Sequence, residues 1–142
     1  MRPDITFIIT DNEKAVQSAL DSDNYIQAFV LVHSLIESLL RAFLNKLNPA
    51  AELRFAELVD QYKAHLAKIQ YPIPTFVDEL TQFNRRRNRM LHCLWRYGFT
   101  YTNNNLKDAA QAAVNLYGLF IEWLQTFDEG LADIGFKLSA QE

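Results

Sequence analysis

The segment "YIQAFVLVHSLIESLLRAFLNKL" (residues 25–47) decides the fold, because apolar side chains dominate it almost from end to end. On a wheel of 3.6 residues per turn, a narrow face of roughly 60° holds most of its polar residues. These residues are Gln27, Ser34, Ser38, Arg41 and Asn45. A helix that is apolar on most of its circumference lies at the centre of a bundle or buries surface against a second protomer. We expect such a helix to begin after Asp23 or Asn24 and to run to about residue 47.

Two residues of this segment depart from the pattern, because His33 and Glu37 lie one turn apart inside the apolar arc. A carboxylate in such a position needs a cation or hydrogen-bond donors. Residues 76–94 supply a candidate, since Arg87 falls at the centre of their apolar stripe. We predict a structural polar pair between Glu37 and Arg87. In the alternative, the Arg87 guanidinium extends past the core and Glu37 is more solvated.

Apolar residues recur at helical spacing along most of the remaining chain, which only four glycines and four prolines interrupt. The expected helices cover residues 10–21, 24–47, 50–68, 75–97 and 105 onward, with a short helix or turn within 128–136. We expect "ITFIIT" (5–10) to be extended and "FTYTNNN" (99–105) to be a polar loop. The sequence thus predicts an all-α, antiparallel bundle of four to five principal helices. It forms a single domain, 1–142, with its core at roughly 24–127.

The composition is that of an ordinary soluble protein, with 49% hydrophobic and 22% charged residues in a chain of 142. Cys93 is the only cysteine, so no internal disulfide can form. We expect no signal peptide, and the sequence contains no uninterrupted apolar run long enough to span a bilayer. We therefore expect a cytoplasmic location and no membrane contact.

Charge is unevenly distributed, although the net charge is only -3. No carboxylate occurs between Glu79 and Asp108, whereas five of the eight arginines lie within residues 85–96. A local cationic patch on an anionic chain indicates a phosphate-rich partner. Outward-facing members of this patch are expected to contact RNA phosphates without reading sequence. They are Arg85, Arg89 and Arg96.

The same stretch carries residues that suit acid–base chemistry on a phosphodiester. Asn88 and His92 are four residues apart and share a helix face, and Arg87 precedes them. An imidazole can move a proton near neutral pH, and a guanidinium can stabilise charge on a phosphoryl group. Asn88 can orient the imidazole or a ribose hydroxyl. This set is sufficient for RNA cleavage without a metal or cofactor, through attack of the ribose 2′-hydroxyl on the adjacent phosphorus.

The run Arg87-Asn88-Arg89-Met90-Leu91-His92 resembles the R-x4-6-H motif of the HEPN superfamily. The helical segments "HSLIESLLRAFL" (33–44) and "AVNLYGLFIEWL" (113–124) are also similar to that superfamily, so the resemblance spans roughly residues 24–127. It implies a helical bundle that forms a homodimer with two motifs in one cleft. It also implies catalytic roles for Arg87 and His92, a supporting role for Asn88, and an endoribonuclease of toxin or phage-defence type.

One departure from the family bears on its partners. In members that pair with a nucleotidyltransferase antitoxin, a tyrosine often stands two residues after the histidine, where this chain has Leu94. This departure disfavours pairing with such an antitoxin, which in any case could not use this residue. We expect any antitoxin or nucleotidyltransferase partner to be a separate protein. The resemblance also allows a second hypothesis: a catalytically inactive dimerisation module that binds a protein partner or a nucleotide.

Simpler interpretations exist for the individual residues. His92 is compatible with an ordinary surface histidine, and His33 with a satisfied buried one. Cys93 points about 100° away from His92 on a helix, which disfavours a Cys–His nucleophilic pair. The three histidines fall on three different predicted helices, so no metal site is expected. Trp95 and Tyr97 are typical of interface or core residues, and alternatively of platforms for base stacking.

Overall fold

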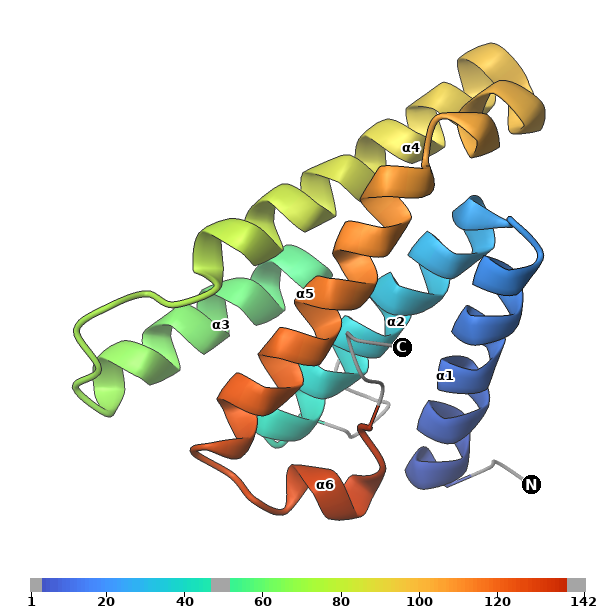
Figure 1. Cartoon of the computed structure of the whole chain (residues 1–142). Helices are drawn as coiled ribbons and strands as arrows, with labels where there is room; N and C mark the ends of the chain where they lie inside the picture. Colours follow the sequence, from blue (N-terminus) through green and yellow to red (C-terminus); the bar gives the residue numbers. More distant parts are fainter. Residues whose placement is uncertain (1–3, 47–51, 138–142) are drawn as a thin grey trace.

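The computed structural model describes residues 4–46 and 52–137, and this part of the chain is all-α, without a strand. Five long helices and one short helix follow one another along the chain. Their bounds are α1 Ile5–Asp21, α2 Tyr25–Phe43, α3 Phe55–Lys68, α4 Val77–Asn104, α5 Lys107–Gln125 and α6 Leu131–Ile134 (Figure 1). The predicted all-α bundle is confirmed.

The central helix is α2, as its apolar circumference predicts. It packs against α1, α3, α4 and α5, and its buried side chains include Phe29, Val32, Leu35, Ile36, Leu39 and Leu40. By length and composition α2 also meets the criterion for a membrane span. The core helix of a soluble protein meets the same criterion, and about half of this apolar stretch of α2 is buried inside the bundle.

The first helix begins at Ile5, so the prediction that residues 5–10 are extended is wrong. Asp4 is the N-cap, and its Oδ1 accepts a hydrogen bond of 2.9 Å from the backbone N–H of Phe7. Ile9 is fully buried in the same core as α2. The β-branched residues of this stretch favour a strand locally, but the cap and the burial of Ile9 outweigh that preference.

The boundaries of α2 and α3 follow local capping. Asn24 starts α2, as predicted, and its side chain accepts from the backbone N–H of Gln27 at 3.2 Å. The expected end near residue 47 lies outside the described residues, and α2 already ends at Phe43. The expected start near residue 50 also lies outside them. In the described part α3 begins after Arg54, whose backbone N–H donates to the Glu57 side chain at 3.0 Å.

The fourth helix is interrupted at Gly98, whose φ of 85° and ψ of 178° are not helical. The sequence predicts that this helix ends at Gly98, and its first part does end there, because such a φ suits a residue without a Cβ. Residues 99–104 form further helix, however, and not the expected polar loop. Asp78 and Glu79 stand in the first turn, where the helix dipole favours them. Figure 1 shows the far end of α4 projecting beyond the ends of α1 and α2 before the chain turns back into α5.

Hydrogen bonds connect α5 to α1 and to α3. The Tyr117 hydroxyl donates to Oε2 of Glu13 on α1 at 2.7 Å. Nε1 of Trp123 donates to the Tyr62 hydroxyl on α3 at 2.9 Å, and that hydroxyl donates to the Thr75 carbonyl at 2.7 Å. Burial raises the pKa of Tyr62 to about 12 and raises that of Tyr117 far above the ordinary value. Both phenols therefore stay neutral in the folded protein.

Candidate functional site

The arginines of α4 form an open cationic face. Arg85, Arg89 and Arg96 are all exposed, as the sequence predicts, and no ion pair within the described residues involves them. The guanidinium carbon of Arg96 lies 5.8 Å from the centroid of the Tyr97 ring. Because the neighbouring sequence has no carboxylate, this face keeps its positive charge and is accessible to a polyanion.

The three motif residues sit at different depths on α4. His92 and Asn88 are exposed, and they lie one helical turn apart. Arg87 is half-buried, and its Nη1 donates a long hydrogen bond of 3.4 Å to Oδ1 of Asn88. The His92 ring lies roughly parallel to that of Trp95, with 6.3 Å between their centroids. The imidazole is therefore open to solvent, while the guanidinium approaches the bundle.

The predicted pair between Glu37 and Arg87 is not formed. Oε2 of Glu37 accepts from Nε of Arg41 at 3.2 Å, and no ion pair within the described residues joins Glu37 to Arg87. The helical wheel assigned Arg41 to the polar face, but its long side chain reaches the carboxylate one turn away. Glu37 therefore finds its cation on its own helix, and its side chain is 36% exposed.

Glu37 and Arg87 nevertheless line a common pocket, which we call the His33 pocket. Its volume is about 410 Å³, and α2, α4 and the start of α3 enclose it. Its lining residues are His33, Glu37, Arg54, Phe55, Ala56, Asn84, Arg87 and Asn88. Two of the motif residues thus face this pocket, whereas His92 does not line it.

His33 forms the buried wall of this pocket. It is 7% exposed, its Nε2 lies 3.0 Å from Oδ1 of Asn84, and its ring stacks on Phe55 with 4.4 Å between centroids. Because a carbonyl oxygen only accepts, the contact places the proton on Nε2. Burial lowers the pKa of His33; the hydrogen bond to Asn84 opposes this shift and the charge of Arg87 adds to it. His33 is thus a neutral, satisfied histidine, as its position in the sequence indicated.

The proximity of His33 and Asn84 to Arg87 was not predicted from the sequence. The sequence does indicate which of these residues share a helix face. Asn84, Arg87 and Asn88 have the spacing of one face, and so do His33 and Glu37. Which face of α4 meets which face of α2 depends on tertiary packing between residues 51 positions apart. Periodicity within one helix does not contain that information.

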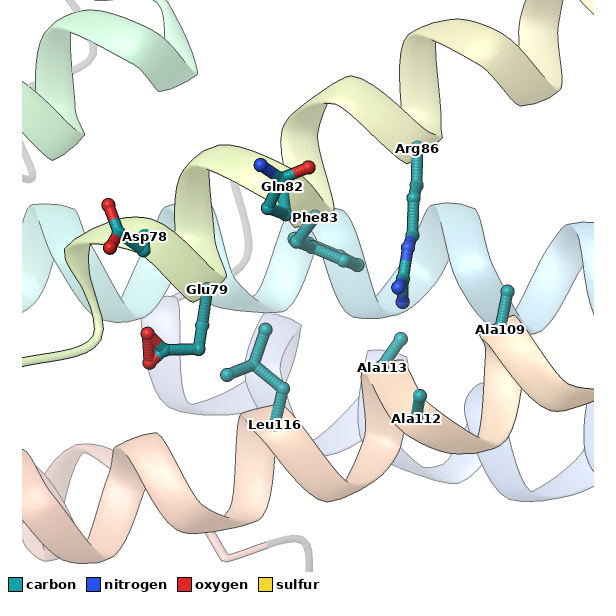
Figure 2. Close-up of a pocket in the computed structure, with 9 residues that line it drawn as sticks. All are labelled: Asp78, Glu79, Gln82, Phe83, Arg86, Ala109, Ala112, Ala113 and Leu116. Atoms are coloured by element: carbon teal, nitrogen blue, oxygen red, sulfur yellow. The ribbon is translucent and has the colours of Figure 1, made fainter.

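A second hollow lies between α4 and α5, with a volume of about 350 Å³ (Figure 2). Small side chains of α5 leave this space, among them Ala109, Ala112 and Ala113. Figure 2 shows Arg86 extending from α4 toward these alanines, with Glu79 nearer the other end of the groove. Arg86 therefore borders a different surface from its neighbour Arg87.

Within the described residues, the remaining histidines and the cysteine do not form a cluster with one another. Within the described part of the chain, no group of three or more His, Cys, Asp or Glu residues is placed to hold a metal ion. His65 is half-buried on α3 and packs edge-on against Phe43, with 5.1 Å between ring centroids. Cys93 is a half-buried free thiol. Of the three histidines, His92 is the exposed one.

Comparisons with known proteins find no counterpart: no family model, no curated protein and no solved structure matches the chain. The resemblance to the HEPN superfamily therefore stays a prediction from the sequence, based on the motif residues and on the segments 33–44 and 113–124.

Proposed function

We propose that the protein is a metal-independent endoribonuclease of toxin or phage-defence type, active as a cytoplasmic homodimer. The observation that carries this proposal is the exposure of His92 on the cationic stretch of α4, one turn from Asn88. A catalytic imidazole must reach a phosphodiester of a large substrate, and a sealed one could not.

The proposed reaction divides two proton transfers between imidazoles. A neutral His92 removes the proton of a ribose 2′-hydroxyl, and the oxygen attacks the adjacent phosphorus. The bond from phosphorus to the 5′-oxygen breaks, and an imidazolium protonates that leaving oxygen. The products are a 2′,3′-cyclic phosphate and a 5′-hydroxyl. Arg87 stabilises the charge that develops on the phosphoryl oxygens, and Asn88 orients the guanidinium through their 3.4 Å contact.

One chain offers a single exposed imidazole, whereas the reaction uses a base and an acid. A second copy of the chain would supply the other His92, which supports the homodimer. Arg85, Arg89 and Arg96 would hold the RNA through its phosphates, with an affinity that falls as salt rises. An antitoxin or nucleotidyltransferase partner would be a separate protein, and it could not modify residue 94, because Leu94 stands where the family often has a tyrosine.

The test is incubation of the purified protein with RNA in the presence of a chelator. We expect wild type to cleave, and we expect His92→Ala to cleave about 10²- to 10⁴-fold more slowly, as is usual for loss of a general acid–base group. Lys63→Ala, an exposed change on α3, is the matched control and should cleave like wild type. Cleavage that survives His92→Ala would discard the catalytic assignment.

A second candidate is the inactive module that dimerises and binds a protein partner or a nucleotide. The exposed aromatic side chains at the projecting end of α4 favour it, above all Trp95 at 82% exposure. This candidate predicts no cleavage by wild type and a concentration-dependent mass in sedimentation. Trp95→Ser would then shift the mass toward the monomer, whereas His92→Ala would not.

A further inference from the structure

A third cavity lies where α4 turns at Gly98 and the chain runs back into α5 (Figure 1). Its volume is about 300 Å³, at the small end of the range for ligand pockets. Residues before the turn, after it and at the start of α5 border this cavity, among them Met90, Cys93, Thr102 and Ala109. We call it the Cys93 cavity. It shares no lining residue with the His33 pocket and none with the proposed catalytic set.

One end of the Cys93 cavity holds a hydroxyl that lacks a hydrogen-bond partner. Thr102 is 4% exposed, and its Oγ1 is buried without a partner among the described residues. Thr102 and Cys93 stand on either side of Gly98, each within about one and a half helical turns of it, so they line the end of the cavity near the turn. An unpaired buried hydroxyl lowers stability, and a ligand oxygen that accepts from it would remove this penalty.

The other end of the Cys93 cavity is positively charged. Arg89 and Arg86 line it, about one and about two helical turns farther from Gly98 than Cys93. Both arginines are exposed, and no ion pair within the described residues involves either. No described Asp or Glu residue lines the cavity. An anionic group at this end would therefore meet two guanidinium groups and no competing carboxylate.

Apolar side chains form much of the wall between these two ends. Met90 is 3% exposed, and Leu106 is half-buried. Arg86 and Cys93 are seven positions apart on α4, which corresponds to about 10 Å along the helix axis. A ligand that satisfies the whole cavity therefore has an anionic group, an apolar chain several carbons long and one hydrogen-bond acceptor at the far end of that chain.

We propose that the Cys93 cavity binds a medium-chain carboxylate that carries a carbonyl oxygen near its far end. The carboxylate contacts Arg86 and Arg89, and the chain packs on Met90. At the far end the Thr102 hydroxyl donates to the carbonyl oxygen. The unpaired hydroxyl of the free protein is thus a binding group, which a valine of the same shape could not replace. This site is independent of RNA cleavage.

The single cysteine of the chain reports whether the cavity is occupied. Intact-mass spectrometry follows the alkylation of Cys93 by iodoacetamide while 7-oxooctanoate, octanoate or inorganic phosphate is added. We expect 7-oxooctanoate to slow alkylation in a saturable way, because the bound chain covers the thiol. Octanoate lacks the carbonyl, so it should need an about threefold to tenfold higher concentration for the same protection, as expected for the loss of one neutral hydrogen bond. Inorganic phosphate should not protect, since it has no chain to cover the thiol.

Two substitutions test the two ends of the cavity separately. Arg86→Gln should weaken the binding of both acids by about tenfold or more, because each loses a charge-assisted hydrogen bond. Thr102→Val should weaken 7-oxooctanoate alone, so that the two acids then bind equally. Arg85→Gln is the matched control: it makes the same change at an exposed arginine that does not line the cavity, and it should alter the binding of neither acid.

Thermal denaturation gives a second measure that does not depend on the reactivity of Cys93. At equal concentration 7-oxooctanoate should raise the melting temperature more than octanoate, since a ligand of the folded state stabilises it according to its affinity. Equal affinity of wild type for the two acids would overturn the proposal, and so would equal binding by Arg86→Gln and Arg85→Gln. Protection by inorganic phosphate, or slowing that never saturates, would also overturn it. Binding of the acid without RNA cleavage would contradict the ribonuclease proposal alone, whereas cleavage without such binding would contradict the Cys93 cavity alone.

Discussion

The bundle around α2 and the projecting end of α4 use similar side chains in opposite ways. Phe29 of α2 is fully buried and lies 5.0 Å from the ring of Phe83, centroid to centroid. The end of α4 instead exposes Leu91, Trp95, Tyr97, Phe99 and Tyr101. The first region converts apolar surface into stability, whereas the second leaves it available for a contact that the isolated chain does not make. Equal hydrophobicity in the sequence thus serves two different purposes.

The largest effect should come from the bundle. Phe29→Ala removes a ring from the packed core, and we expect it to lower the free energy of unfolding by about 3–5 kcal/mol. Chemical denaturation followed by circular dichroism measures this change. A loss below about 1 kcal/mol, as is usual at the surface, would mean that α2 is not the centre of the bundle.

Local periodicity explains why the bundle was predictable. The apolar arc of residues 25–47 required a helix that is covered on most sides, by its own bundle or by a second protomer, and α2 is central in the bundle. The ends of helices were less predictable where a single contact decides whether a residue is helical. Residues 5–10 have strand propensity, yet the cap by Asp4 and the burial of Ile9 make them helical. Gly98 was correctly identified as a break, but the helical turn after it depends on packing that the sequence does not display.

The sequence predicted the part of the candidate site that lies on a single helix, but not the contacts between helices. The spacing of Arg87, Asn88 and His92 placed them on α4, and the structure adds that they differ in depth. The contact between His33 and Asn84 joins two helices and lay beyond the reach of spacing arguments. The predicted partner of Glu37 was wrong for a simpler reason, since Arg41, one turn away on the same helix, already pairs with this carboxylate.

Alkaline pH should weaken the bundle through Tyr62. Its pKa is about 12 in the folded protein, against an ordinary value of 10.0, so between these values the unfolded chain loses a proton that the folded chain keeps. The contribution of this group to stability is therefore complete below pH 10 and falls as pH rises toward 12, by on the order of 2 kcal/mol. Tyr62→Phe should show a shallower loss across this window in denaturation at stepped pH. Parallel curves for the two proteins would show that Tyr62 does not stay neutral.

An intermediate effect is expected where the returning part of α4 meets the bundle. The Oγ1 atom of Thr102 is buried and has no hydrogen-bond partner among the described residues. Thr102→Val keeps the shape of the side chain and removes this polar atom, so we expect a gain of about 1 kcal/mol in the free energy of unfolding. Thr100→Val, an exposed change two residues earlier, should give no gain. A loss at Thr102 would indicate that its hydroxyl has a partner in solution.

The smallest effect should come from the projecting end itself. Trp95 is 82% exposed, so Trp95→Ala removes a large ring that packs on little of its own chain. We expect the free energy of unfolding to change by less than about 0.5 kcal/mol at low protein concentration, where a second copy is absent. Measuring Trp95→Ala again at high protein concentration shows whether Trp95 faces solvent or is covered by a second copy of the chain. A cost that appears only as concentration rises would show that Trp95 is buried by another copy of the chain, because binding to the folded state adds to its apparent stability. A cost of several kcal/mol at every concentration would instead mean that the end of α4 folds back onto the bundle, and the contrast between the two regions would fail.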